Sequence, residues 1–112
     1  MTDEQSHPEV SDEATSLATR LLALGSTQRL RIVAELLAGE LHVSELARRV
    51  EMSRALLYMH LTKLEAAGFV SGRLELGDDG KAVKIFKVVP FDITVNPEVI
   101  AAAVSSHTPN KE

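Results

Sequence analysis

The chain has 112 residues, with 45% hydrophobic and 4% aromatic side chains, a formal net charge of −4 and no cysteine. This length suits one domain with a single aliphatic core, and the absence of thiols excludes disulfides and thiolate metal sites. The N-terminal segment lacks the basic and apolar regions of a signal peptide, and no apolar run approaches the roughly 20 residues that span a membrane, so we expect a cytoplasmic protein without a membrane partner.

The negative charge is concentrated at the N-terminus. Five of the 16 acidic residues lie within the first thirteen positions, which contain no Lys or Arg, and this leaves 11 acidic residues against 12 basic ones in the remainder. Residues 1–11 are polar and charged and are expected to form a disordered tail. Between Leu41 and Arg73 five basic residues stand against three acidic ones, and this mildly basic middle permits contact with the phosphates of nucleic acid.

Two helices are predicted in the first forty residues. Ser11 is a plausible N-cap for the first, whose apolar residues have helical spacing and which ends at Gly25. Ser26 or Thr27 caps the second, which ends at Gly39. Each helix has one apolar stripe, so each is expected to pack one face on a core.

A short helix and a longer one follow. Ser44 is predicted to begin the short helix "SELARRVE", and Ser53 is predicted to cap the helix "RALLYMHLTKLEAAG", which ends at Gly68. Leucines repeat in the longer helix at the spacing of one helical face. These core leucines are Leu57, Leu61 and Leu64.

The hydrophobic period changes to two after residue 68. "FVSGRLEL" and "KAVKIFKVV" are rich in β-forming residues and are separated by the turn signal "GDDG", which predicts a β-hairpin. Pro90 closes the hairpin, and a helix of small residues, "EVIAAAVSS", follows Pro97. We expect one domain over residues 12–105, with a polar tail over 106–112.

The order of these elements is that of a winged helix-turn-helix, a mainly α (α+β) fold with four helices, a hairpin and a fifth helix. The segment "STQRLRIV" resembles the pattern s-x-x-R-l-x-I-l in the second helix of the arsenic-repressor (ArsR) family of bacterial and archaeal regulators. "HLTKLEAAGFV" is similar to that family's H-L-x-x-L-x-x-A-G-L-V. The resemblance runs from Ala14 to Ala103 and implies a DNA-binding transcriptional regulator. Motifs of enzymatic catalysis are not evident, so we expect neither an enzyme nor a cofactor.

The resemblance implies that the fourth helix enters the major groove of double-stranded DNA. Arg54 is expected to contact a guanine, Ser53 and Tyr58 to contact phosphates, and Leu56 or Met59 to touch thymine methyl groups. Basic residues of the hairpin are expected to contact phosphates or the minor groove, whereas its acidic tip is not. The predicted DNA-binding residues are His42, Arg49, Ser53, Arg54, Ala55, Leu56, Tyr58, Met59, Lys63, Arg73, Lys81 and Lys84.

The start of the third helix bears on metal sensing. Family members that sense thiophilic metals carry E-L-C-V-C-D-L there, whereas this chain reads "ELHVSEL", with His42 and Ser44 in place of both cysteines. We expect no metal, although a nickel or zinc site built from His42 with the tail residues His7 and His107 stays open as an alternative. His60, which matches the His of H-L-x-x-L, is expected to be a packed side chain.

The first and last helices contain more apolar residues than a three-helix core needs. In the family these helices form a homodimer, and a two-fold dimer reads an inverted repeat in DNA. The residues predicted at this interface are Ala14, Leu17, Leu21, Leu22, Val99, Ile100, Ala103 and Val104. Two alternatives stay open: the same regulator with a metal or small-molecule effector, and a winged-helix module for protein–protein interaction. The acidic balance and the apolar outward face of the fourth helix favour the second.

Overall fold

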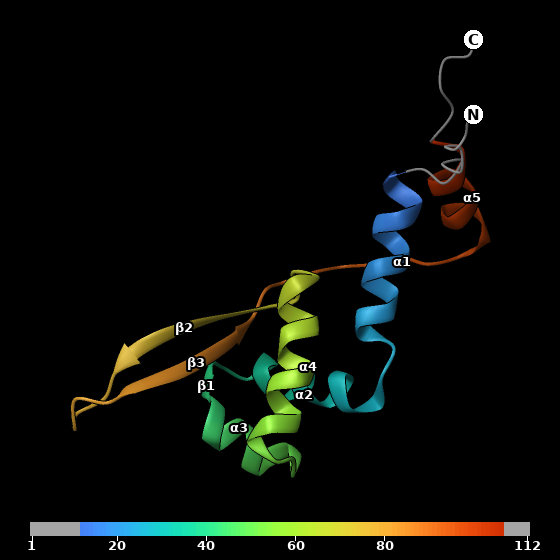
Figure 1. Ribbon diagram of the computed structural model, residues 1–112. Coiled ribbons are helices and arrows are strands. Elements are labelled where there is room, and N and C mark those ends of the chain that lie inside the picture. Colours follow the sequence, from blue (N-terminus) through green and yellow to red (C-terminus); the bar gives the residue numbers. More distant parts are fainter. Residues whose placement is uncertain (1–11, 107–112) are drawn as a thin grey trace, which may run out of the picture. The chain divides into compact units, whose positions relative to one another are not determined.

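The computed structural model describes residues 12–106, so the expected tail over residues 1–11 and almost all of the one over 106–112 lie outside the described residues. The elements of the described part follow one another as shown in Figure 1. They are α1 (Asp12–Leu24), α2 (Thr27–Leu37), β1 (Leu41–His42), α3 (Val43–Val50), α4 (Arg54–Ala66), β2 (Val70–Leu76), β3 (Ala82–Val88) and α5 (Pro97–Ser105). The predicted order is confirmed, with β1 as an addition. None of the helices in this range is long and apolar enough to cross a membrane.

The chain forms two compact units. One is Ala23–Phe91, which contains the helix-turn-helix and the sheet, and the other is made of the described residues on either side of it. The sheet has three antiparallel strands in the order β1-β3-β2. The hairpin of β2 and β3, here called the wing, pairs Val70 with Val88 and Leu76 with Ala82. The strand β1 pairs with β3 through only two residues, which is too short to leave a periodic signal in the sequence.

The helix starts follow from local hydrogen bonds. The Ser26 side chain accepts from the Arg29 amide at 3.3 Å and the Ser53 side chain accepts from the Leu56 amide at 3.1 Å, which confirms two predicted N-caps. The expected start of the third helix at Ser44 is wrong by one residue: α3 begins at Val43. The preceding residue is still paired in β1, so the chain turns directly from strand to helix.

The core of the Ala23–Phe91 unit is mainly aliphatic, as expected, although Phe69 and Phe86 are also buried in it. The helix α4 runs through this core. The three predicted leucines of α4 are at most 1% exposed. This helix packs against α2, α3 and β2, and it ends where Gly68 adopts a φ of +86°, which only glycine adopts at little cost. The other buried apolar side chains are Ala23, Ile32, Leu36, Val43, Leu46, Ala47, Val50, Phe69, Val70, Ile85 and Phe86.

The unit formed by the start of α1 and α5 has no comparable core. Asn96 caps α5 by accepting from the Val99 amide at 2.8 Å, and Pro97 occupies the first turn, yet no side chain of α5 is buried. The two helices enclose an apolar hollow of about 200 Å³. Six residues of the predicted dimer interface line it: Ala14, Leu17, Leu21, Ile100, Ala103 and Val104. Of the other two, Val99 lines a neighbouring hollow and Leu22 is 74% exposed.

Truncation of Leu57 to alanine is expected to lower the free energy of unfolding by about 2–5 kcal/mol, because it leaves a cavity in a fully buried part of the core. Leu37→Ala is the matched control, since that side chain is 77% exposed and its loss is expected to change stability by less than about 0.5 kcal/mol. Urea unfolding of both variants at one protein concentration measures this. Equal losses would contradict the assigned core.

Candidate nucleic-acid interface

The helix α4 turns one face to solvent. Leu57, His60, Leu61 and Leu64 are buried, and the residues between them are exposed, including Met59 at 51%. The predicted DNA-binding residues of α4 lie on this outward face, except Leu56, which is half-buried. Thr62 is also exposed there and was missed by the sequence prediction. Its position three residues after Met59, at helical spacing, is the signal that could have found it.

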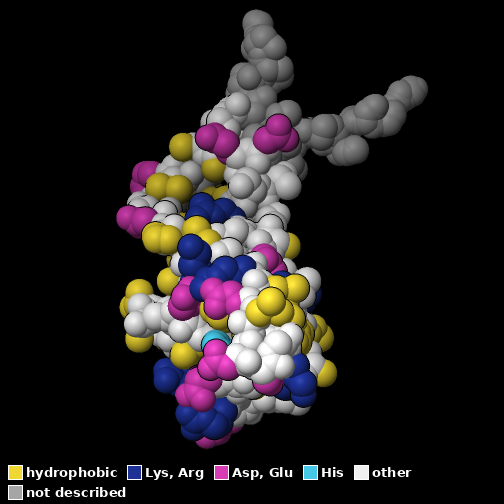
Figure 2. Space-filling model, turned by 90° about the vertical axis from the view of Figure 1, so that its left-hand side faces the viewer, with side chains coloured by type: hydrophobic (Ala, Val, Ile, Leu, Met, Phe, Trp, Pro, Cys, Tyr) yellow, Lys and Arg dark blue, Asp and Glu magenta, His cyan; other side chains and the backbone are white. Residues whose placement is uncertain are grey.

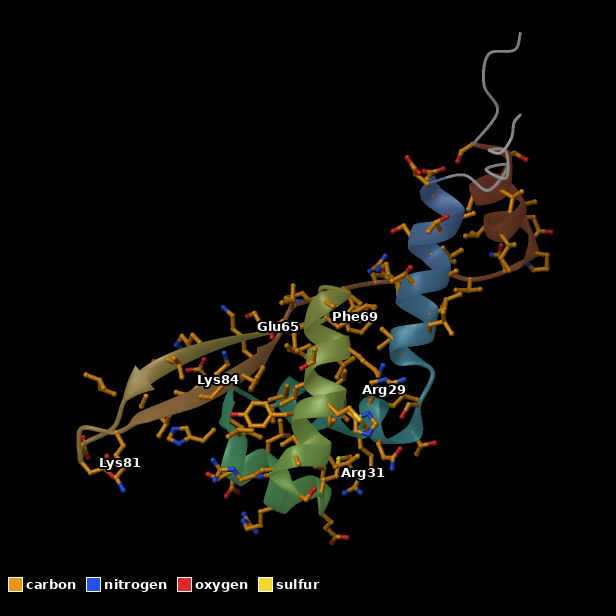
Figure 3. The ribbon with its side chains drawn as sticks, viewed as in Figure 1. Arg29, Arg31, Glu65, Phe69, Lys81 and Lys84 are labelled. Atoms are coloured by element: carbon orange, nitrogen blue, oxygen red, sulfur yellow. The ribbon has the colours of Figure 1, made fainter. Side chains whose placement is uncertain are left out.

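The wing lies beside α4, and a cluster of aromatic and basic side chains joins them. The Tyr58 ring meets the Phe86 ring edge-on, with centroids 6.4 Å apart. Lys84 Nζ lies 5.7 Å from the centroid of the same Phe86 ring, a cation–π distance. Gly72 lies opposite Phe86 in the sheet, and its amide donates to Glu65 Oε2 of α4 at 3.3 Å. Glu65 and Lys84 are labelled in Figure 3.

Arg73 of the wing is paired with two carboxylates. Its guanidinium donates to both oxygens of Glu40 at 2.7 and 2.9 Å and to Glu75 Oε2 at 2.7 Å. The hydrogen bonds from Arg73 hold the pKa of Glu40 below its ordinary value, so the pair is charged at neutral pH. The contact of Arg73 with DNA remains a prediction. In such a contact the phosphate would meet a guanidinium whose positive charge is already balanced by Glu40 and Glu75.

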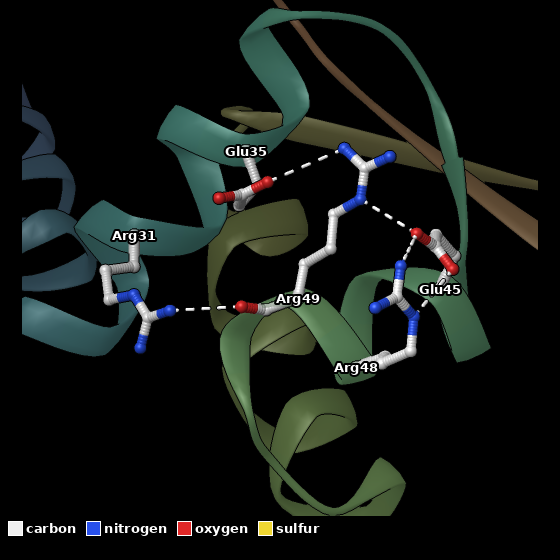
Figure 4. A network of polar contacts seen from close by, with 5 residues as sticks. All are labelled: Arg31, Glu35, Glu45, Arg48 and Arg49. Carbon is white, nitrogen blue, oxygen red and sulfur yellow. Dashed lines mark hydrogen bonds and ion pairs between the residues drawn. The ribbon is translucent and has the colours of Figure 1, made fainter.

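The two arginines of α3 are also balanced (Figure 4). Glu45 accepts from both Arg48 and Arg49, and their hydrogen bonds lower the pKa of Glu45 to about 2. Glu35 of α2 lies 3.7 Å from Arg49. Arg31 donates to the Arg49 carbonyl at 3.1 Å and thereby caps the end of α3. The face seen in Figure 2 accordingly mixes acidic with basic side chains rather than presenting one basic patch.

A hollow of about 230 Å³ lies beneath the wing. Residues from the start of α3, from α4 and from the wing line it. The polar lining residues are His42, Ser44, Arg54, Tyr58 and Lys84. Three predicted DNA-binding regions are thus brought together at one place. Lys81 and Lys63 are exposed and do not line this hollow.

Comparison with known proteins shows which family has this architecture. The pattern described as "Bacterial regulatory protein, arsR family" matches residues 26–71. An HTH-type transcriptional regulator of Methanocaldococcus jannaschii is 35% identical over 78 residues, which are 70% of this chain and 81% of that protein. The chain belongs to the ArsR family of transcriptional regulators. The winged helix-turn-helix predicted from the sequence is therefore confirmed, and the family consists of DNA-binding regulators rather than enzymes.

Two solved structures extend the comparison. HlyU from Vibrio cholerae has a TM-score of 0.60 and 28% identity and aligns over 86% of this chain and 92% of its own. A homodimeric winged helix-turn-helix domain from Mycobacterium bovis has a TM-score of 0.63 and aligns over 95% of this chain and 85% of its own. Because its identity is only 21%, it supports the fold alone.

Two positions of the ArsR sequence patterns meet in the structure. Arg29, the arginine of s-x-x-R, donates through Nη1 to Nδ1 of His60, the histidine of H-L-x-x-L, at 3.0 Å. Arg29 Nε donates to the Ala23 carbonyl at 2.6 Å. His60 is 6% exposed, which confirms that it is a packed side chain. Since Nδ1 accepts, Nε2 carries the proton, and this buried atom has no hydrogen-bond partner among the described residues.

The described residues were compared with the requirements of a metal site. Within residues 12–106, no group of three or more His, Asp or Glu side chains is arranged to hold a metal ion. His42 is exposed and lies at the start of α3, as expected. His7 and His107, its suggested partners, lie outside the described residues.

His60 is expected to make the stability of the regulator fall in mild acid. Burial, together with the positive charges of Arg29 and Lys63, lowers the pKa of His60 below its ordinary value of 6.5. The unfolded chain therefore takes up this proton at a higher pH than the folded chain, so stability is complete above about pH 6.5 and is lost as the pH falls below it. Each unit of difference in pKa corresponds to about 1.4 kcal/mol.

The measurement is urea unfolding of wild type and His60→Gln at about pH 7.5 and about pH 5. The other three histidines are present in both proteins, so the difference between the two pH dependences isolates His60. Wild type should lose more stability than the variant. Parallel curves would show that the two states share one pKa for this residue.

Proposed function

We propose that this regulator acts as a homodimer that binds an inverted-repeat operator through α4 and the wing. The observation that carries the proposal is the outward face of α4: its leucines are buried, and its exposed residues stand beside a wing fixed to them by Tyr58 and Phe86. A rigid helix with one free face, next to a hairpin, suits the major groove and the adjoining backbone.

The homodimer is supported by the apolar residues of α1 and α5. Ile100 is 44% exposed, and no side chain of α5 is buried, although its residues are almost all apolar. Uncovered apolar helices of this kind mark an interaction surface. The Mycobacterium bovis domain with the same fold is homodimeric. A two-fold dimer presents two recognition helices about 34 Å apart, which matches successive major grooves.

Selection of bound sequences from a random duplex pool tests the proposal, with parallel selections that contain Ni²⁺ or Zn²⁺. An inverted repeat enriched equally in all conditions is expected. Enrichment that requires a metal would favour an effector site that includes His42. The failure of any sequence to be enriched, with no salt-dependent binding to DNA, would overturn the proposal in favour of a protein-interaction module.

The dimer is expected to depend on the apolar surface of α5. Ile100→Glu would place a charge in a desolvated interface, so this variant should sediment as a monomer at micromolar concentration while wild type sediments as a dimer. Leu37→Glu, at an exposed leucine of α2, is the matched control and should stay dimeric. A monomeric wild type, or an Ile100→Glu variant that remains dimeric, would contradict the assignment of this interface.

A further inference from the structure

We propose that the hollow beneath the wing binds one phosphate group of the DNA backbone, held by Arg54 and Lys84. This inference rests on the proposed function and deepens it. It gives Arg54 a partner different from the guanine expected from the sequence, and it assigns the wing contact to one lysine.

The charge of the hollow supports an anion. None of its nine lining residues is acidic. Arg48, Arg49 and Arg73, by contrast, are each paired with glutamates. Within the described part of the chain, Arg54 and Lys84 form no ion pair with a carboxylate. Two uncompensated cations at one concave site attract a negative group such as phosphate.

Lys84 is oriented by the Phe86 ring in the absence of a ligand. Its ammonium group lies over the Phe86 ring, and the ring is held by Tyr58. This packing needs a glycine at position 72. A Cβ atom on Gly72 would lie 2.6 Å from Phe86 Cε1 and 2.9 Å from Lys84 Cε, so any other residue would displace both side chains. An ammonium group held in this way loses little conformational freedom on binding.

Arg54 lines the same hollow from a different element. It is the first residue of α4, directly after the N-cap Ser53, and it lines the hollow together with Lys84. In duplex DNA one backbone strand separates a major groove from the next minor groove. A protein with α4 in the major groove and the wing next to it therefore spans that strand, and the hollow between them faces its phosphates. Tyr58 and His42 also line the hollow, and their side chains are of types that can donate hydrogen bonds.

The test measures the salt dependence of DNA binding between about 50 mM and about 200 mM for wild type, Arg54→Ala and Lys84→Ala. Each variant should bind the selected operator and a scrambled duplex more weakly by a similar factor, roughly tenfold, and should reduce the slope of log K against log salt by about one. Lys87→Ala is the matched control, because this exposed lysine of β3 does not line the hollow, and it should leave the slope unchanged.

Gly72→Ala keeps both charges but displaces Lys84, so it should reduce the slope as Lys84→Ala does while the protein stays folded by urea unfolding. A series of duplexes, each with one phosphate replaced by a neutral methylphosphonate, should show one position per half-site at which wild type binds more weakly. At that position the affinity of Arg54→Ala should be unchanged. If Arg54→Ala instead keeps the slope and loses discrimination at one base pair, Arg54 reads a base and the proposal is wrong.

A second arm separates DNA from free phosphate as the source of the group. The chain has one tyrosine and no tryptophan, so the ring signals of Tyr58 in NMR spectra report on the hollow. Inorganic phosphate is titrated into DNA-free wild type and into Lys84→Ala. A wild type that binds operator with the expected slope, with no saturable response to millimolar phosphate, identifies the backbone as the ligand. A saturable response without DNA binding would refute the proposed function and make the hollow a site for a free anion. A wild type that shows neither DNA binding nor a saturable phosphate response would overturn both the proposed function and the phosphate site.

Discussion

The burial of three leucines of α4 is the constraint on which the rest of the interface depends. Leu57, Leu61 and Leu64 remove one face of the helix from water and so fix its rotation about its own axis. His60 and Tyr58, two residues apart, then point to opposite sides of the helix. His60 meets Arg29 of α2, and Tyr58 meets Phe86 of the wing. The outward face is what remains, so packing decides which side chains of α4 are available to a partner.

Carboxylates decide which basic residues are available to a negative partner. Glu45 engages both arginines of α3, and Arg73 is held between Glu40 and Glu75. These pairs are exposed and contribute little to stability individually. Their larger effect is on the electrostatic potential at the surface, because each pair cancels a positive charge that a count of basic residues in the sequence treats as free. The mild positive balance of residues 41–73 is thus concentrated on fewer side chains than their composition indicates.

Most of the fold could be predicted from the sequence because it is encoded locally. The caps at Ser26 and Ser53, the leucine spacing and the "GDDG" turn each act within a few residues, and each is found where the pattern placed it. The strand β1 and the start of α3 at Val43 were missed, because they depend on pairing with Ile85 and Phe86, more than forty residues away. The glutamate pairs and the hollow beneath the wing arise in the same way, from side chains that only the tertiary structure brings together.

The two-residue strand β1 has a mechanical consequence. Its pairing with β3 attaches the wing to the segment that enters α3, and Glu40, one residue earlier, holds Arg73 on β2, the strand on the other side of β3. The wing and the start of α3 are therefore both attached to the short segment that contains His42. A displacement of that residue would move both elements together. A molecule bound at His42 would therefore change how both the wing and α3 fit a DNA groove, and not only one contact.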